Sequence, residues 1–261
     1  MSELLLEAEG LTKTFRSAGR TVTALDAVSI QLSRGETLGL VGPSGSGKST
    51  LARVIMRLIA PDAGTLRFGG TDLLALDGAL LRRARKRLQM VFQDPLGAFN
   101  PRATVGSALA DPLRIHGIVP AAGRRRAMEA LLDRVGLPRD FLTRSIHEIS
   151  GGQRQRVAIA RALATEPDLI VLDEAVSALD LTVRNRILDL LVDLQRERGV
   201  AYLFVSHDIA VVRAVAHRVA VMDRGAIVET GPTTAVVASP QSATGRALVA
   251  AVPRFPTKVT Q

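Results

Sequence analysis

The apolar residues of the chain form short runs that alternate with helical patterns. Continuous apolar runs, typical of buried strands, occupy residues 3–9, 24–32, 37–41, 64–70, 88–94, 168–174 and 200–208. An amphipathic helix is predicted over residues 181–197, where one face carries Val183, Ile187, Leu190, Leu191 and Leu194. Because strand and helix patterns alternate, the sequence predicts an α/β fold.

Three regions depart from this alternation. From about residue 95 to 165 the pattern changes to helices, which we expect to be broken at Pro101, Pro112, Pro120 and Pro138. Residues 217–231 predict a β-hairpin that turns at Arg224-Gly225. From about residue 239 onward we expect a loosely packed tail, which contains Pro240, Pro253 and Pro256.

Composition narrows the class of protein. A length of 261 residues with 47% hydrophobic content fits one large globular domain, or a domain with a smaller subdomain. No apolar run reaches the ~18 residues of a membrane-spanning helix, and the acidic start MSELLLEAEG lacks the basic region of a signal peptide. The absence of cysteine excludes disulfides and thiolate metal sites, and the four histidines lack metal-ligand spacing. We therefore expect a cytoplasmic protein.

The net charge of +9 is concentrated in two short clusters, Arg82–Arg87 and Arg124–Arg126. Such clusters are typical of solvated helix faces or of a surface near lipid headgroups. Nucleic acid is the weaker interpretation, because one Tyr and no Trp leave few aromatic side chains for base stacking.

A glycine-rich stretch between a predicted strand and a predicted helix has the pattern G-x-x-x-x-G-K-[ST]. Its backbone N–H groups and the following helix N-terminus favour phosphate binding. Lys48 is expected to reach the β- and γ-phosphates of a nucleotide, and the Ser49 hydroxyl to ligate Mg²⁺. The predicted ATP-binding residues of this P-loop are Gly42, Pro43, Ser44, Gly45, Ser46, Gly47, Lys48, Ser49 and Thr50.

Polar side chains follow three other apolar strands. Asp173 and Glu174 end "LIVLDE", Gln93 follows "MVF", and His207 follows "LFVS". Asp173 is suited to hold Mg²⁺, and Glu174 to orient and polarise the attacking water. Gln93 could contact both the metal and the water, and His207 the γ-phosphate. Taken singly, the acid pair could instead cap the next helix, and Gln93 and His207 would more often be structural.

The stretch "HEISGGQRQR" at 147–156 places a serine and two glycines before a helical run. It has the layout of a second phosphate-binding helix N-terminus, but it lacks the lysine needed to retain nucleotide by itself. With Gly42–Thr50, "ISGGQ", "LIVLDE", "SALD" and "SHD" in this order, the chain resembles the ATP-binding subunit of ABC transporters over residues 1–240 or so.

This resemblance implies a P-loop NTPase (RecA-like) core with an antiparallel β subdomain and an inserted α-helical subdomain. The core and β subdomain would comprise residues 1–94 and 165–238, the helical signature subdomain 95–164, and a C-terminal tail 239–261. Two cassettes would close face to face around two ATP molecules, with Mg²⁺ as the metal cofactor.

The resemblance also implies roles for individual residues. Phe15 would stack on adenine, where Tyr is commoner in the family, while Gln93 would belong to the Q-loop and His207 would be the switch histidine. Ser150, Gly151, Gly152 and Gln153 would contact the γ-phosphate of ATP held by the opposite subunit. The D-loop would consist of Ser177, Ala178, Leu179 and Asp180.

Finer features resemble the peptide/nickel importer subfamily, on the evidence of "FQDPLGAFNPR" and "SPQSATGRALVAAVPRF". Ser242-Ala243 replaces the segment usual in that subfamily, and a cysteine-containing extension is missing, so peptide, nickel or another small solute stays open. The implied partners are a second ATPase, identical or paralogous, two membrane permeases and an extracytoplasmic solute-binding protein, with no nucleic acid. The implied location is peripheral, on the cytoplasmic face of the inner membrane.

Two alternatives belong to other classes. A non-transport ABC ATPase acting on nucleic acid or ribosomes would carry long coiled-coil or zinc insertions, or tandem cassettes, whereas about 100 residues separate the P-loop from "ISGGQ" in this single cassette. A P-loop kinase of small molecules would have no use for "SGGQ".

Overall fold

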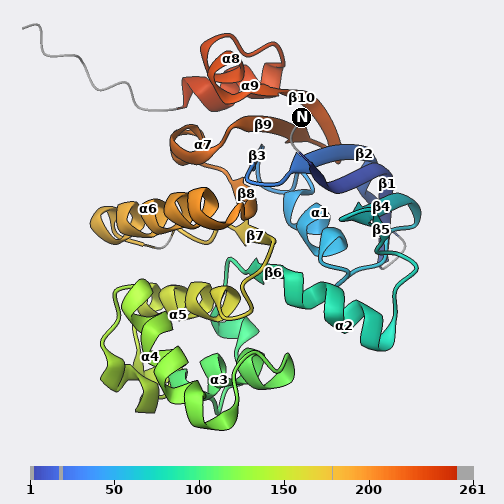
Figure 1. The fold of residues 1–261 in the computed structure, drawn as a ribbon. Helices are drawn as coiled ribbons and strands as arrows, with labels where there is room; N and C mark the ends of the chain where they lie inside the picture. Colours follow the sequence, from blue (N-terminus) through green and yellow to red (C-terminus); the bar gives the residue numbers. More distant parts are fainter. Residues whose placement is uncertain (1–2, 18–19, 178, 252–261) are drawn as a thin grey trace, which may run out of the picture.

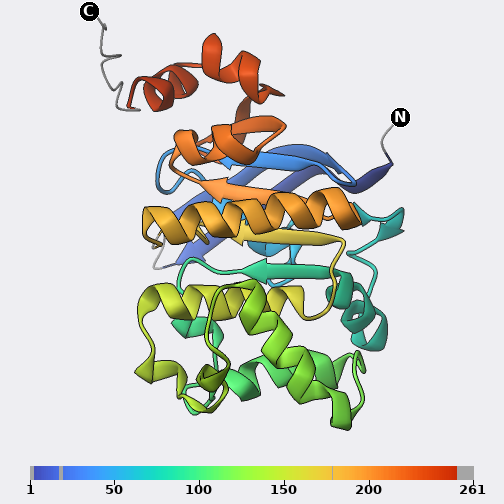
Figure 2. The ribbon, with the colours of Figure 1, turned by 60° about the vertical axis from the view of Figure 1, so that its left-hand side comes forward.

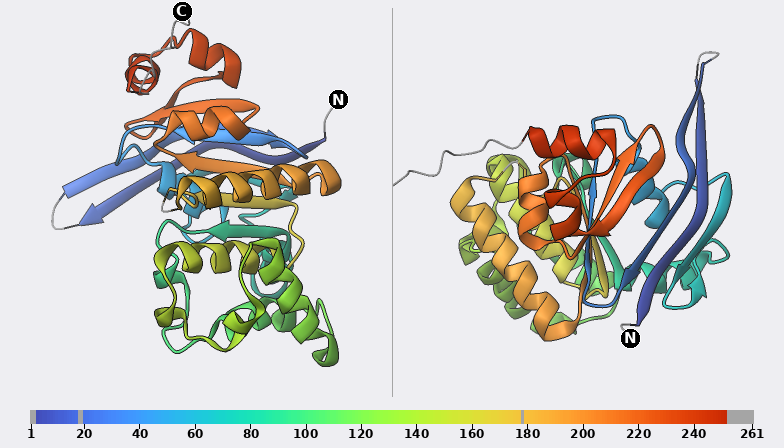
Figure 3. Two further views of the ribbon diagram at one scale, coloured as in Figure 1. Left: turned by 90° about the vertical axis from the view of Figure 1, so that its left-hand side faces the viewer. Right: turned by 90° about the horizontal axis from the view of Figure 1, so that it is seen from above.

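Two β-sheets and a set of helices make up the fold, in a computed structural model that describes residues 3–17, 20–177 and 179–251. An antiparallel sheet has the strand order β2-β1-β4-β5, and a second sheet has the order β10-β9-β3-β8-β7-β6. Seen from above (Figure 3, right), the antiparallel sheet, the second sheet and the helix layer follow one another across the molecule. The predicted α/β class is confirmed.

The antiparallel sheet contains two strands much longer than the apolar runs predicted. β1 and β2 pair from Leu4↔Ser33 to Ser17↔Arg20. The outer half of this hairpin is polar and largely exposed, so an apolar run detects only its buried half. The strands of this sheet are β1 (Leu4–Ser17), β2 (Arg20–Ser33), β4 (Ala63–Phe68) and β5 (Thr71–Asp72).

The second sheet forms the centre of the molecule. Five of its strands are parallel, and the sixth, β10, pairs with β9 in the predicted hairpin. In β8, Leu203 and Val205 face the core shared with the antiparallel sheet, whereas Tyr202 and Phe204 face the helical core. The strands are β3 (Thr37–Val41), β6 (Leu88–Val91), β7 (Leu169–Asp173), β8 (Ala201–Ser206), β9 (Arg218–Asp223) and β10 (Ala226–Pro232).

The helices pack on both faces of this central sheet. α1 contributes to the core between the two sheets, and α6 lies on the opposite face. α5 packs on the edge strand β6, with α3 and α4 packed on α5, as Figures 1 and 2 show. The helices are α1 (Lys48–Ile55), α2 (Gly78–Arg87), α3 (Val105–Ile115), α4 (Arg124–Arg134), α5 (Gly151–Leu163), α6 (Leu181–Arg198), α7 (Ile209–Val215), α8 (Thr233–Ala238) and α9 (Ala243–Ala250). Within the described ranges, none of them has the length and apolarity required to span a bilayer.

The region predicted as the helical insertion, residues 95–164, spans α3, α4 and α5. Besides α3 and α4 it contains the 3₁₀ turns η1 (Leu96–Ala98), η2 (Ala121–Gly123), η3 (Arg139–Thr143) and η4 (Ile146–Glu148). The expected break at Pro112 is wrong, because α3 continues through this residue to Ile115. Near a helix end, proline removes only one hydrogen bond, and burial of Leu109 and Leu113 holds the helix together.

The C-terminal segment is also more ordered than expected. The predicted loose tail is wrong for residues 239–251, because these residues include α9, which packs against β9. The Glu229 carboxylate on β10 accepts hydrogen bonds from the Gln241 N–H at 2.8 Å, and from the Ser242 N–H and hydroxyl at 2.9 and 2.6 Å. Asp223 on β9 accepts a further hydrogen bond from the Thr244 hydroxyl at 3.0 Å. The tail is therefore attached to the sheet by acidic side chains, chiefly Glu229, that the proline pattern could not reveal.

Removing this carboxylate should release α9 while sparing the core. Burial alone would raise the pKa of Glu229, but hydrogen bonds from Ser242 and Gln241 outweigh it, so the folded-state pKa is lowered. The attachment is therefore complete above the ordinary Glu pKa of about 4.3 and is lost as pH falls through the lower folded-state value. We expect Glu229→Ala to give rapid proteolysis near residues 239–243 at pH 7, and wild-type protein to show it only in acid. Glu197→Ala, at an exposed position of α6, is the control; equal protection of Glu229→Ala and wild type would contradict this role.

Candidate functional site

The P-loop joins the end of β3 to the first residue of α1, Lys48. Gly47, which precedes α1, has φ +106°, and a Cβ there would lie 2.3 Å from the Ala24 carbonyl oxygen. Only glycine fits this turn, because both the backbone angle and the close approach exclude a side chain. The turn directs the first N–H groups of α1 into the loop, which gives it the form of an anion site.

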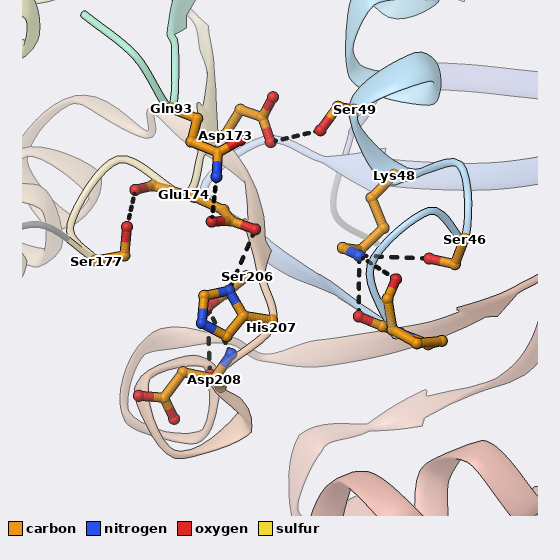
Figure 4. A network of polar contacts seen from close by, with 12 residues as sticks. Ser46, Lys48, Ser49, Gln93, Asp173, Glu174, Ser177, Ser206, His207 and Asp208 are labelled. Atoms are coloured by element: carbon orange, nitrogen blue, oxygen red, sulfur yellow. Dashed lines mark hydrogen bonds and ion pairs between the residues drawn. The ribbon is translucent and has the colours of Figure 1, made fainter.

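The Lys48 ammonium lies within the loop that it follows. Its Nζ donates to the carbonyls of Gly42 and Pro43 at 2.9 and 2.8 Å, and reaches the Ser46 hydroxyl at 3.4 Å. Burial lowers the pKa of Lys48, while the negative charges of Glu174 and Asp173 oppose this effect. The cation is thus held at the mouth of the loop by groups that a phosphate oxygen could replace (Figure 4).

A cavity of about 380 Å³ lies beside the P-loop. Its walls come from β2 residues 22–24, the P-loop, and Arg224 at the β9–β10 turn. The turn is joined to the loop because the Gly225 N–H donates to the Ser46 carbonyl at 2.9 Å. Val22 and Arg224 are lining residues that the sequence analysis missed, since it identified Arg224 only as part of a turn.

Phe15, the predicted adenine-stacking residue, lies on β1 directly opposite Val22. Its side chain is 40% exposed, and the Lys13 Nζ lies 5.7 Å from its ring centroid. The ring is therefore at the edge of the same wall as Val22, where a flat ligand can approach it. Stacking on adenine stays a prediction.

Asp173 ends β7 and meets the P-loop from across the sheet edge. The Ser49 hydroxyl donates to its Oδ1 at 3.2 Å. Asp173 is 2% exposed, and burial raises the pKa of this carboxyl, with a further rise from Glu174 and an opposing effect of the Ser49 bond. A hydroxyl and a carboxylate are oxygen ligands of the kind that Mg²⁺, a hard ion, prefers. The residues thus fit the predicted metal, although the described residues hold no group of three or more acidic, His or Cys side chains.

Glu174 is held between Gln93 and His207, as Figure 4 shows. Gln93 Nε2 donates to Glu174 Oε2 at 2.8 Å, and His207 Nδ1 lies 3.2 Å from Oε1. The Glu174 backbone has φ +50°, a conformation that non-glycine residues rarely adopt and that is enriched at functional sites. Two side chains that are far apart in sequence therefore converge on one carboxylate, which is itself only 17% exposed.

The segment after Glu174 includes the predicted D-loop. Ser177 donates through its hydroxyl to the Glu174 carbonyl at 2.8 Å. Leu179 is buried, and Asp180 caps α6 by accepting from the Val183 N–H at 2.9 Å. Ala178 lies outside the described residues. Ser177 therefore contacts the backbone of Glu174 directly.

The predicted signature residues cap helix α5. The Ser150 hydroxyl accepts from the Gln153 N–H at 3.2 Å, and Gln153 Oε1 accepts from the Ser150 N–H at 2.8 Å, a reciprocal capping box. A Cβ added at Gly151 would meet nothing within 4 Å, so the described part of the chain does not itself demand glycine there. At Gly151 the N-terminus of α5 is therefore open to a ligand group that another molecule supplies.

The structure thus brings together two sets of predicted residues. Lys48, Ser49, Gln93, Asp173, Glu174 and His207 gather at one edge of the central sheet. Among the described residues, by contrast, Ser150 to Gln153 make no hydrogen bond or ion pair with the P-loop or with Glu174. The second set is separate from the first within one chain.

A P-loop on a parallel sheet, an acidic strand end and an isolated capped helix in a helical insertion define an ATP-binding cassette. The family model for ABC transporters matches residues 25–177, and the chain belongs to this family. The antiparallel sheet, the parallel core and the inserted helices all agree with the predicted fold.

Among curated proteins, the chain is 50% identical over 234 residues, 90% of its length, to the glutathione import ATP-binding protein GsiA of Escherichia coli strain K12. It is 48% identical over 258 residues to GsiA of Salmonella paratyphi A. The chain spans 38% and 41% of these relatives. Among solved structures, the dimeric bacterial ABC transporter cassette MJ0796 has a TM-score of 0.83 and 31% identity, with 88% of this chain and 99% of that chain covered.

Replacement of Lys48 by alanine tests the P-loop. Without the ammonium, the loop loses the positive charge that the structure places inside it, so we expect ATP affinity to fall at least tenfold. Titration with a fluorescent ATP analogue measures this, with Lys86→Ala on α2, away from the cavity, as a control. ATP affinity within twofold of wild type in Lys48→Ala would disprove the role given to the loop.

Proposed function

We propose that the chain is the ATP-hydrolysing subunit of an ABC importer of the peptide/nickel type. The observation that carries this proposal is the position of the Glu174 carboxylate, between Gln93 and His207 and next to the P-loop. Hydrolysis needs a carboxylate that orients water in line with the γ-phosphate, and this is the carboxylate that the geometry offers.

Each residue of the cluster has one task in this proposal. The P-loop N–H groups and Lys48 bind the phosphates, and Glu174 accepts a hydrogen bond from the attacking water and polarises it. His207 contacts the γ-phosphate, and Gln93 aligns both the water and Glu174. Phe15 and the wall around Val22 receive the adenine.

Mg²⁺ is the proposed metal, held by the Ser49 hydroxyl and by Asp173 through water, with Gln93 as a third ligand. When bound, the ion neutralises charge on the β- and γ-phosphates. Asp173 is suited to this task because its burial disfavours an uncompensated negative charge. No other described acidic residue donates to or accepts from Ser49.

A dimer completes the site in this proposal. The α5 N-terminus has unpaired N–H groups and a positive dipole but no lysine, so it serves as half of a phosphate site. The open approach at Gly151 supports contact with a γ-phosphate that a second cassette holds. The similarity to MJ0796, whose structures are described as dimeric, supports the same arrangement.

The identity to two GsiA proteins supports an importer of small peptides, such as glutathione, over one of nickel. The proposed assembly contains two cassettes, two permeases and an extracytoplasmic binding protein, with this chain peripheral on the cytoplasmic face of the membrane. A nucleic-acid role has no support here: the helices between the P-loop and α5 have at most 11 residues, too short for coiled-coil arms.

Glu174→Gln isolates the chemical step. The amide keeps the shape of the side chain but cannot polarise water, so we expect ATP binding to persist and kcat to fall at least 100-fold. Phosphate release and size-exclusion chromatography with ATP measure turnover and the ATP-bound dimer. Glu148→Gln, on the turn before α5, is a control that should keep wild-type turnover. Hydrolysis unchanged in Glu174→Gln would remove Glu174 from its role.

The same variant tests the transport proposal in cells. A strain that carries Glu174→Gln in place of wild type should lose uptake of radiolabelled glutathione or a related small peptide. Uptake of labelled nickel in wild-type cells, without peptide uptake, would replace peptide by nickel as the solute. If the Glu174→Gln strain took up both peptide and nickel at the wild-type rate, this result would contradict a transport role.

Ser150→Arg tests the contact in trans. The side chain would block the α5 N-terminus, so we expect normal ATP affinity of the isolated chain but hydrolysis reduced at least 100-fold. Mixing Ser150→Arg with Glu174→Gln chains should leave one composite site with an intact signature and an intact carboxylate, and so restore part of the activity. A collapse of the ATP affinity of the Ser150→Arg chain itself would refute the assignment in trans.

A further inference from the structure

Helix α5 holds the loop that carries Gln93 at two points. Gln155 Nε2 faces the Phe92 carbonyl oxygen at 3.4 Å, immediately before Gln93. Further along the helix, Arg161 Nη1 donates to the Ala98 carbonyl at 2.8 Å, and its guanidinium lies 4.6 Å from the Phe99 ring centroid. The segment 92–99 is therefore fixed to α5 at both of its ends.

The contact between Gln155 and Phe92 buries a polar side chain, and close packing alone does not explain why this residue is polar. Gln155 is 1% exposed, and its Oε1 is buried without a hydrogen-bond partner among the described residues. An unpaired buried oxygen lowers the free energy of unfolding. Leucine, of similar size, would avoid this cost, so folding stability alone favours an apolar residue at this position. The presence of glutamine here is explained if its N–H₂ group is needed to hold the Phe92 carbonyl.

The second contact also involves a polar group in a largely apolar setting. Burial lowers the pKa of Arg161, and only Asp111 opposes this effect. Phe99 is 6% exposed and belongs to the helical core. The planar guanidinium both stacks on this ring and donates to the carbonyl beside it, a combination that lysine cannot reproduce.

We propose that Gln155 and Arg161 are positioning residues that couple the signature end of α5 to the Gln93–Glu174 contact of the same chain. Ser150 lies five residues before Gln155, about 7.5 Å along the helix axis. Since α5 is one hydrogen-bonded helix, a displacement of its N-terminus by the ATP of the partner cassette moves Phe92, and with it Gln93. The hydrogen bond from Gln93 to Glu174 then forms or breaks. Each chain thereby couples the ATP held by its partner, which contacts α5, to the ATP held by its own P-loop, which Glu174 serves.

This inference rests on the proposed function, and Gln155→Leu is its sharpest test. In the full chain we expect an unchanged or raised melting temperature and unchanged ATP affinity of the monomer. We expect kcat to fall about tenfold and the Hill coefficient for ATP to fall toward 1. Amide hydrogen exchange of residues 93–97 should rise at least tenfold in the isolated chain, while exchange in β7 should not change.

Two further variants keep the test decisive. Gln89→Leu is the matched control, because Gln89 Nε2 also donates to a backbone carbonyl, that of Arg85 on α2, and not to one in the segment 92–99; wild-type values are expected. Arg161→Lys retains the charge but loses the stacking, and should raise exchange of residues 96–99 and lower the Hill coefficient. If Gln155→Leu folds poorly, the hydrogen exchange and the Hill coefficient of Arg161→Lys test the proposal in its place.

Wild-type exchange of residues 93–99 in both Gln155→Leu and Arg161→Lys would overturn the proposal, as would a wild-type kcat and Hill coefficient in both variants. These outcomes are distinct from a failure of the proposed function, which would appear as a wild-type chain without ATP turnover. The exchange measurement needs no turnover, so the two contacts are tested in either case.

Discussion

Burial of β3, β7 and β8 on both faces is the constraint on which the rest of the structure depends. Every side chain within these strands must be apolar or internally bonded, so chemistry is possible only where the strands end. Because the strands are parallel, their carboxyl ends share one edge, where Asp173 ends β7 and Gly42 and His207 follow β3 and β8. The order of strands in the sheet therefore assembles a site from residues up to 165 positions apart.

The sequence could predict those parts of the fold whose structure is determined by residues that are neighbours in the chain. The P-loop is a contiguous turn, the buried strands are contiguous apolar runs, and the Arg224-Gly225 hairpin is a contiguous turn signal. Such features depend on neighbours in the chain. The residues at strand ends could also be predicted, because the pairing of parallel strands leaves them little choice of place.

The parts that could not be predicted depend on contacts across the fold. Arg224 reaches the cavity because the β9–β10 turn packs on Ser46, and Glu229 holds α9 through a contact 13 residues away. Gln155 likewise looks like one more polar residue of an amphipathic helix, although it is almost completely buried. No periodicity marks such residues, since their importance arises from the backbone carbonyl or N–H group that the fold places opposite them.

The left-handed backbone at Glu174 has a consequence for how such a chain changes over time. For a residue other than glycine this conformation costs about 1–2 kcal/mol, and Asn and Gly adopt it more readily. Replacement of Glu174 by Gly or Asn would thus relieve this strain and remove the carboxylate together, so under the proposed mechanism loss of hydrolysis would coincide with a gain in folding stability. At this position the requirement of the proposed chemistry for a carboxylate and the preference of the backbone for Gly or Asn thus oppose each other.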